Sequence, residues 1–382
     1  MTNTVPTIAP GSFTVDKGLA DHPVYFLTVR GMKVVVKGEA KGSTGHDRTD
    51  QDTATSIKWG SKLMKNVNDS QVNTKIMDQA EVNAFLYAAR PKFKPLPPIP
   101  GSGIAPTPPP KQYLNVSAAG AQNYTWVKMP VVDGLTDADF TKKVRGFTTP
   151  IPGKVREQIV KFTDETLWPS LGKVLAVDIF NGNNDRFDIG TGRWINYGNV
   201  MFVDQGSRVI GLDTFDPNTK KSNLVNHGRY DELKTLIDAQ EQNTFAKACA
   251  QSVGETLEFD AFGKGAQYMT LPVDAPHGKV LWQVKPGEVK DLYLPCAPAL
   301  AAGIAKGSSE LKAYLQRKVQ QYRQRAQGGP PQRPPPPAPG QRARARGGPP
   351  PKPNAMVFNN VGSIPGIPQG ILDRMDYLGW LV

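Results

Sequence analysis

The chain has few of the residues that build disulfide-bonded or metal-stabilised folds. Its 382 residues include two cysteines, Cys249 and Cys296, and four histidines without metal-ligand spacing. Two cysteines cannot form a disulfide framework or a four-ligand zinc site, and neither has a local sequence typical of a catalytic thiol. We therefore expect both to be reduced, in a fold held together by an apolar core to which 39% of the residues can contribute.

Long apolar stretches are also missing. No run reaches the roughly 18 consecutive apolar residues of a membrane-spanning helix, so we expect a protein that does not span a membrane. Residues 1–12 contain neither a positive region nor the apolar stretch of a cleaved secretory signal. These features predict a cytoplasmic protein, or one exported without such a signal.

Acidic residues are absent from a long region near the C-terminus. Between Leu311 and Lys352 there is no Asp or Glu, and the region contains ten basic residues: Lys312, Arg317, Lys318, Arg323, Arg325, Arg333, Arg342, Arg344, Arg346 and Lys352. Because the net charge is +12, the rest of the chain is close to neutral. This distribution argues against specific nucleic-acid binding by the globular part and indicates a solvated basic appendage.

Proline is abundant in two stretches. Residues 91–110 contain nine prolines, which predicts an extended loop, and eleven more lie between Pro330 and Pro353. The second stretch cannot bury enough apolar surface to order itself. Its proline runs, flanked by arginines, are typical ligands of SH3-type, EVH1 or profilin-like partners. The alternative is a solvated linker that tethers the last apolar element.

The other patterns predict an α+β fold with two lobes. A hairpin is expected at Val24–Val29 and Met32–Lys37, around the turn Arg30-Gly31, and a further strand at Tyr124–Val132. Helical spacing is found at 57–67, 78–90, 170–181 and 242–257, and Thr136-x-x-Asp139 indicates another helix start. We divide the chain into an N-terminal lobe, a mostly helical lobe, a basic helix, a disordered linker and a short apolar element, at 12–130, 131–310, 311–327, 328–354 and 355–382. A core ending before the linker is expected to keep its stability.

Three segments, taken in order, contain the residue types that phosphoryl transfer from ATP requires. Lys37 ends an apolar strand, Asp185 lies in a polar break after a buried helix, and a short hairpin runs from Asn199 to Asp213. The reaction needs a cation on the phosphates, a carboxylate at the acceptor hydroxyl, and amide and carboxylate oxygens on magnesium. Because two strands and a turn separate Asn199 from Asp213, we expect both side chains at the same end of the hairpin.

The stretch Leu175-x-x-Asp178-x-Phe180-x-Gly182-Asn183-x-Asp185-Arg186 resembles the catalytic loop of atypical protein-kinase-like enzymes, such as actin-fragmin kinase and HipA-type kinases. The resemblance covers roughly residues 12–260. It implies a bilobal kinase-like fold with ATP and magnesium as cofactors, and a protein Ser/Thr kinase activity with a protein substrate.

The resemblance also implies roles for individual residues. Asp185 would be the catalytic carboxylate, Asn199 and Asp213 the magnesium ligands, and Lys37 the lysine on the ATP phosphates. Adenine would meet the strand that contains Val127 and Met129. Arg186 would orient the loop or a phosphate.

Some features depart from the kinase pattern. No G-x-G-x-x-G loop is present, and Asp185 and Asn199 are 14 positions apart, compared with about five in ordinary protein kinases. Glu81, on a helix, is the expected carboxylate partner of Lys37, with Glu39 and Asp78 as alternatives. Taken singly, each candidate residue fits a turn or a strand end better than a catalytic role.

Other functions remain open at this stage. The chain could be a pseudokinase scaffold that binds partners through its fold and its proline-rich stretch without phosphate transfer. It could instead associate with RNA or membranes through the basic region. Within the kinases, a lipid or a small molecule could be the acceptor.

Overall fold

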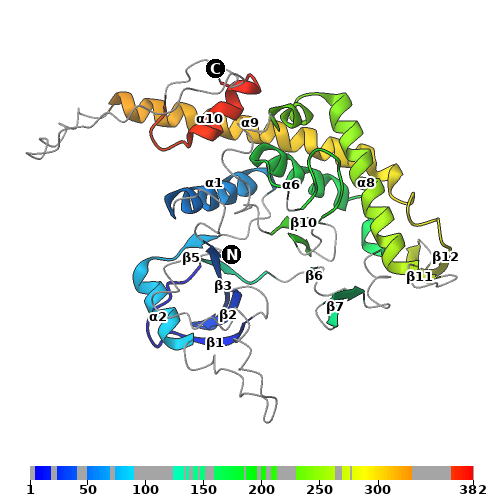
Figure 1. The fold of residues 1–382 in the computed structure, drawn as a ribbon, viewed down its shortest axis with the longest axis horizontal. Coiled ribbons are helices and arrows are strands. Elements are labelled where there is room, and N and C mark those ends of the chain that lie inside the picture. Colours follow the sequence, from blue (N-terminus) through cyan, green and yellow to red (C-terminus); the bar gives the residue numbers. More distant parts are fainter. Residues whose placement is uncertain are drawn as a thin grey trace, which may run out of the picture.

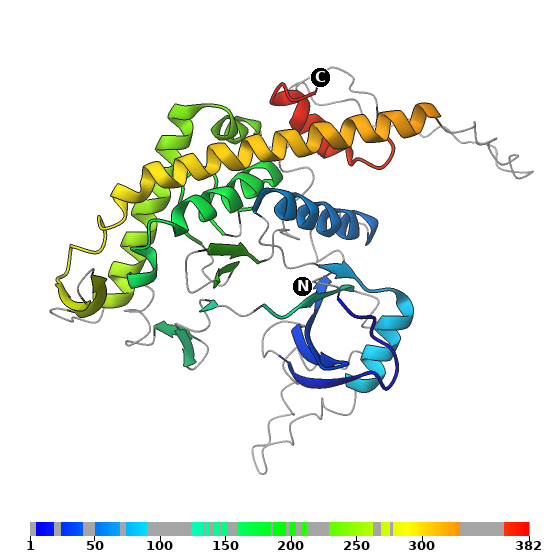
Figure 2. The ribbon, with the colours of Figure 1, turned by 180° about the vertical axis from the view of Figure 1, so that it is seen from behind.

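The computed structural model has an N-terminal five-stranded antiparallel sheet followed by a mostly helical region (Figure 1, Figure 2). The structure describes residues 5–18, 24–40, 50–68, 74–89, 124–132, 135–136, 141–144, 147–150, 159–184, 186–195, 199–203, 208–212, 229–262, 269–275, 278–328 and 363–381. The two proline-rich stretches and the candidate residues Asp185 and Asp213 lie outside these ranges. In the part of the chain that is described, no helix has the length and apolar character of a membrane span.

The N-terminal sheet has the strand order β1-β2-β3-β5-β4. Its strands are β1 (Phe13–Gly18), β2 (Val24–Val29), β3 (Met32–Ala40), β4 (Lys75–Ile76) and β5 (Tyr124–Pro130). The predicted hairpin of β2 and β3 is confirmed. Arg30 and Gly31 both have positive φ, of 48° and 79°, as a two-residue turn between twisted antiparallel strands requires.

One face of this sheet is sealed by α2 (Gln79–Ala89). Side chains alternate along β2, so that Tyr25 and Leu27 point into a core that also contains Phe85 of α2. Val5 and Ile8 are buried in the same core. The N-terminal unit therefore begins before the expected boundary at residue 12, because the preceding segment supplies part of its apolar interior.

Helix α1 (Asp50–Asn68) lies between the sheet and the helical region (Figure 1). It contacts β4 and β5 on one side and the helices α6 and α9 on the other, and its Trp59 and Leu63 are buried in the helical core. The sequence shows helical spacing only from residue 57, but the helix already begins at Asp50. Packing of its apolar end lets polar residues extend the helix.

A small sheet packs on α6, with the strand order β10-β9-β6. It consists of β6 (Leu135–Thr136), β9 (Val200–Val203) and β10 (Arg208–Gly211). The expected helix start at Thr136 is wrong, because this residue pairs as a strand with Met201 of β9. Two hairpins lie outside this sheet: β7 (Thr141–Val144) with β8 (Phe147–Pro150), and β11 (Met269–Ala275) with β12 (Gly278–Val284).

The helical region is built on α6 (Leu167–Asn181) and the long α9 (Ala297–Gly328), with α8 (Ala239–Phe262) and the short helices η5 (Arg229–Leu236) and η6 (Leu294–Cys296) beside them. Helices α6 and α9 approach closely through glycines. A Cβ on Gly172 would lie 2.4 Å from the Leu300 carbonyl oxygen, and one on Gly303 would lie 2.4 Å from that of Pro169. Helix α9 runs through the expected boundary at residue 310, so the basic helix is no separate unit. Half of the ten cations therefore belong to a helix whose other face is in the core.

The C-terminal element also belongs to the main core. Residues 363–381, which include α10 (Gln369–Tyr377), bury Leu372, Met375 and Trp380 against the helical region. The Trp380 ring stacks on Phe180 of α6 with centroids 5.8 Å apart, and its carbonyl oxygen accepts a 3.0 Å hydrogen bond from Gln316 Nε2 of α9. The short apolar element that the sequence analysis places after the linker therefore packs into the main core.

Candidate functional site

The sheet face opposite α2 contains Lys37 and the adenine-strand candidates. In the strand register Lys37 pairs with Val127, and Val35 pairs with Met129. Residues paired across antiparallel strands project from the same face, so these four side chains share it, as do Val24 and Phe26 of β2. Val24, Phe26, Val35 and Met129 are only partly buried, whereas the α2 face is sealed. This arrangement leaves an apolar, partly open surface around one lysine.

Lys37 pairs with Glu39 on its own strand. Its Nζ lies 2.9 Å from Glu39 Oε1, and the two side chains are 17% and 10% exposed. The expected ion pair with Glu81 is not what the structure shows, because Glu81 points into the α2 side of the sheet while Lys37 points to the other side. Of the three carboxylates considered from the sequence, Glu39 is the one placed beside Lys37.

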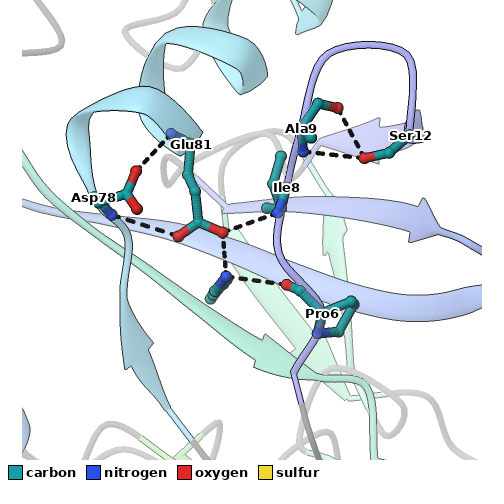
Figure 3. A network of polar contacts seen from close by, with 7 residues as sticks. Pro6, Ile8, Ala9, Ser12, Asp78 and Glu81 are labelled. Carbon is teal, nitrogen blue, oxygen red and sulfur yellow. Dashed lines mark hydrogen bonds and ion pairs between the residues drawn. The ribbon is translucent and has the colours of Figure 1, made fainter.

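Glu81 instead organises a buried polar network beneath the N-terminal segment (Figure 3). It pairs with Lys128 of β5, and the same carboxylate accepts a 2.8 Å hydrogen bond from the Ile8 amide. Lys128 Nζ also donates to the Pro6 carbonyl oxygen at 3.0 Å, and Asp78 Oδ1 accepts the Glu81 amide at 2.9 Å. The network fixes residues 6–8 to α2 and β5, so its role in this structure is to hold the fold.

Lys128 was missed as an important residue in the sequence. It lies between Val127 and Met129, where it reads as one polar residue in an apolar strand. A usable signal is the spacing of two: Tyr124, Trp126 and Lys128 are at every second position of the strand and so share one face. The two aromatic residues indicate that this face is buried. A lysine there needs a carboxylate partner, since an isolated buried charge is costly.

The polar break after α6 is held in place by Asp178. Helix α6 ends at Gly182, whose φ of 70° allows the Asn183 amide to donate to the Asp178 carbonyl oxygen at 2.9 Å. Asn183 Nδ2 also donates to the Asp178 carboxylate at 3.0 Å. The start of the candidate catalytic loop is thus tied back to the last turn of the helix.

Arg186 joins this loop to the β9–β10 hairpin. Its side chain is fully buried and paired with Asp178. Its Nε donates to the Asn199 carbonyl oxygen at 2.9 Å, and its Nη2 donates to the Leu212 carbonyl oxygen. Arg186 therefore orients the loop, one of the two roles expected for it.

The two ends of the hairpin are adjacent, as its short length predicts. The Leu212 amide donates to the Asn199 carbonyl oxygen at 2.9 Å, so these residues continue the pairing of β10 with β9. Asn199 is buried, with 7% of its surface exposed. Asp213 is the next residue after Leu212 and lies outside the described residues.

The long spacing from Asp185 to Asn199 is taken up by a small folded excursion. Phe187 and Trp194 form a β-bridge and stack with ring centroids 5.8 Å apart. The Trp194 amide donates to Ser252 Oγ of α8 at 2.9 Å, while the Ile195 amide returns to the Arg186 carbonyl oxygen at 3.0 Å. The extra residues therefore pack against α8 and bring the chain back to Arg186, so the spacing is compatible with a loop and hairpin that meet.

A second ion pair lies further along the Lys37 face. Asp16, at a bulge in β1, accepts hydrogen bonds from Lys33 at 2.9 Å and Thr28 at 2.8 Å. The hydrogen bond from Lys33 is the main cause that lowers the pKa of Asp16. Lys33 and Lys37 are both on β3 and share a face, but they differ in exposure. Lys33 is exposed and pairs with Asp16, whereas Lys37 is mostly buried, pairs with Glu39 and borders the apolar surface.

Neither cysteine is poised as a nucleophile. Burial raises the pKa of the Cys249 thiol well above its usual value, and burial followed by the charge of Glu165 raises that of Cys296. Both thiols are therefore protonated near neutral pH, whereas the thiolate is the reactive form. Within the described ranges no group of three His, Cys, Asp or Glu side chains forms a metal site.

No model of a known protein family and no curated protein sequence matches this chain. Two structural features bear on its function: the Lys37 face of the sheet, and the junction that Arg186 forms between the loop and the hairpin.

Proposed function

We propose that this protein is an ATP- and magnesium-dependent phosphotransferase of protein-kinase-like architecture, with a protein serine or threonine as the acceptor. The observation that supports it best is the Arg186 junction. One buried guanidinium contacts Asp178, the carbonyl of Asn199 and the carbonyl of Leu212, which directly precedes Asp213. These contacts fix the backbone at Asn199 and Leu212, and Asp185 and Asp213 are the chain neighbours of Arg186 and Leu212.

The N-terminal sheet supports the same proposal. In protein kinases the ATP lysine is on the third strand, at the end of an apolar run. Lys37 ends the run Val34-Val-Val on β3. The partly buried apolar side chains around it, which include Met129 and Val35, are suited to one face of a purine ring, with the buried Val127 beneath them on the same face.

The residues fit magnesium in their chemistry. Asn199 and Asp213 offer amide and carboxylate oxygens, which are the ligands that this ion takes. When bound, magnesium would neutralise charge on the transferring phosphate. Asn199 follows one end of the excursion and Asp213 follows Leu212, so the peptide chain keeps both close to the junction.

The remaining steps belong to the side chains of this chain. Lys37 holds the phosphates as a point charge, and Glu39 keeps its ammonium in place. Asp185, which directly precedes Arg186 in the chain, orients the acceptor hydroxyl and takes its proton during transfer. Arg186 and Asp178 contribute by position, and a catalyst of this kind works chiefly by positioning and charge neutralisation.

One observation favours a second candidate, a pseudokinase scaffold. The first strand is preceded by Gly11 and ends at Gly18, without the glycine-rich loop that covers phosphates in protein kinases. A protein of this kind would bind ATP in a magnesium-dependent way but show no turnover.

The test is transfer of the γ-phosphate from labelled ATP into a proteome extract. Asp213→Ala should abolish transfer while the protein keeps its fold, and Asn199→Ala should weaken transfer and raise the magnesium requirement. Glu255→Ala, an exposed carboxylate on α8, is the matched control and should leave the rate unchanged. Unchanged transfer in Asp213→Ala would remove the proposal, whereas ATP binding without transfer in the wild type selects the scaffold.

A further inference from the structure

The last turn of α6 is covered by the C-terminal element, residues 363–381. Phe180 of this turn is fully buried, and the Trp380 ring stacks on it with an angle of 2° between the ring planes. The guanidinium carbon of Arg374, on α10, lies 5.9 Å from the centroid of the same Phe180 ring. Two side chains of one element therefore hold this ring, by aromatic stacking and by a cation–π contact.

Phe180 lies between the residues that hold the loop after α6. Asp178, two positions before it, accepts the Asn183 amide at its carbonyl oxygen, and its carboxylate binds the Asn183 side chain and Arg186. Gly182, two positions after Phe180, ends the helix in the left-handed conformation. Because a buried turn is close-packed, a displacement of Phe180 also displaces Asp178 and the groups bonded to it. The C-terminal element is thereby coupled to the loop.

The backbone of the C-terminal element directs the Trp380 ring toward α6. Helix α10, red in Figure 1, ends in a Schellman motif, in which the Trp380 amide donates to the Met375 carbonyl oxygen at 2.7 Å. The Gly379 amide donates to the Asp376 carbonyl oxygen at 2.9 Å, and Gly379 has a φ of 63°, which side chains other than glycine adopt at a cost. The hydrogen bond from Gln316 Nε2 of α9 then holds the Trp380 carbonyl oxygen at 3.0 Å. Turn and hydrogen bond together fix the backbone from which the ring projects.

This coupling reaches the loop and not the Lys37 face. Phe180 and Trp380 belong to the core of the helical region, which among the described residues contains none from the five-stranded sheet. The sheet has its own core, around Phe85 and Trp126. A change at Trp380 is therefore expected to act on the loop after α6 and to leave the strand that contains Lys37 in place.

We propose that the C-terminal element positions the loop after α6 for phosphate transfer, with Trp380 as the positioning residue. This inference rests on the proposed phosphotransferase function and adds a controlling element to it. Phosphate transfer should depend on the Trp380 stack, because displacing a positioned group by about 1 Å can cost on the order of a hundredfold in rate. ATP binding should not depend on it, because the Lys37 face belongs to the separate sheet.

The test is the steady-state rate of phosphate transfer by the full chain, measured below the melting transition of every variant. Trp380→Leu keeps an apolar side chain but loses the ring, so its kcat should fall about tenfold or more, while its Kd for ATP stays at the wild-type value. Trp380→Phe keeps a ring and should restore most of the rate. Gly379→Ala keeps the Trp380 ring but strains the turn that presents it, so it should also lower kcat.

Two variants serve as matched controls. Gly370→Ala makes the same chemical change as Gly379→Ala within α10, at a position where the nearest atom to a new Cβ is 3.9 Å away, and should keep the wild-type rate. Leu300→Ala leaves a cavity in the same core beside Gly172, near the other end of α6. It should lower the melting temperature without lowering the kcat of the folded protein. An equal loss of kcat in Leu300→Ala and Trp380→Leu would mean that the element acts through stability alone, and would overturn the proposal. So would a wild-type kcat in Trp380→Leu.

Hydrogen exchange distinguishes a failure of this inference from a failure of the proposed function. The amides of Asn183, Ile195 and Leu212 are hydrogen-bonded at the loop and the hairpin. Trp380→Leu should make them exchange faster than Leu300→Ala does. If the wild type transfers no phosphate, the proposed function fails, and faster exchange in Trp380→Leu still supports the coupling of the element to the loop. Unchanged exchange in Trp380→Leu overturns the coupling, whatever the rate of transfer.

Discussion

Asp178 and Arg186 form an ion pair that is almost completely removed from solvent, with side chains 2% and 0% exposed. The arginine then donates to the carbonyl oxygens of Asn199 and Leu212. One buried cation therefore sets where the loop after α6 lies relative to the β9–β10 hairpin. Its loss would affect both stability and the geometry of the candidate site.

Asp178→Ala should lower the free energy of unfolding by about 3–5 kcal/mol, because it leaves the buried Arg186 charge without a partner. Urea denaturation measures this change. Lys173→Ala serves as the control, since it breaks the more exposed pair with Glu310, whose atoms are 2.8 Å apart, and should cost at most about 1 kcal/mol. Equal losses would show that Arg186 is compensated by other groups.

Lys37→Met should greatly reduce phosphate transfer with little change in thermal stability, because methionine keeps the length but not the charge that holds the phosphates. Lys33→Met is a matched control on the same strand and face, with its side chain 63% exposed and paired with Asp16. It should retain most of the activity. If Lys33→Met is the inactive variant, the phosphates lie at the other end of β3.

Glu39→Gln and Glu81→Gln should affect different properties: the first ATP affinity, the second thermal stability. Glu39→Gln removes the carboxylate beside Lys37, so it should weaken ATP binding and leave the melting temperature nearly unchanged. Glu81→Gln leaves the buried Lys128 without a counter-charge, so it should lower the melting temperature clearly. Below its transition the Glu81 variant should bind ATP normally. Isothermal titration and thermal scans separate the two, and loss of ATP affinity in the folded Glu81 variant would contradict the assignment.

The raised pKa of Tyr25 should make the stability of the protein fall at high pH. Burial raises its pKa to about 12 from 10.0, so between these values the unfolded chain loses the phenolic proton while the folded one keeps it. Stability is therefore fully present below pH 10 and falls as pH rises, by about 2–3 kcal/mol at pH 12. Urea midpoints across this range, compared with Tyr25→Phe, measure the effect. A difference between the two proteins that does not change with pH would exclude it.

Trp380→Ala should lower the free energy of unfolding by about 3–5 kcal/mol, because it removes a buried indole that stacks on Phe180. Phe259→Ala, at a ring that is 74% exposed on α8, should change it by less than about 0.5 kcal/mol. Denaturant melts of both variants suffice. A small effect of Trp380→Ala would support the view that the C-terminal element is dispensable.

Short-range sequence patterns are enough to predict several elements of the fold. The β2–β3 hairpin follows from two β-rich runs around Arg30-Gly31, and α6 follows from a long apolar segment that ends before Gly182. The pairing of β9 with β10 follows from two short strand-like runs that are close in the chain. In each case the residues that decide the structure are neighbours in the chain, so their pattern is visible in a short window.

The features that were missed depend on distant partners. Thr136 looks like a helix start until β9 is there to pair with it, and the capping pattern then loses to the strand ladder. Lys128 is buried because α2 brings Glu81 over it. Lys37 pairs with Glu39 and not with Glu81, because Lys37 and Glu81 lie on opposite faces of the sheet. The face on which a strand residue lies depends on the register, which the sequence alone does not show.

The stack of Trp380 on Phe180 has a consequence for how the chain is made. Trp380 is synthesised 200 residues after Phe180, which is about half of the chain. At cellular rates of elongation that interval is on the order of 10 s. Until then the face of α6 that carries Phe180 lacks its cover, and a nascent chain with such an uncovered apolar surface is the kind of species that chaperones bind.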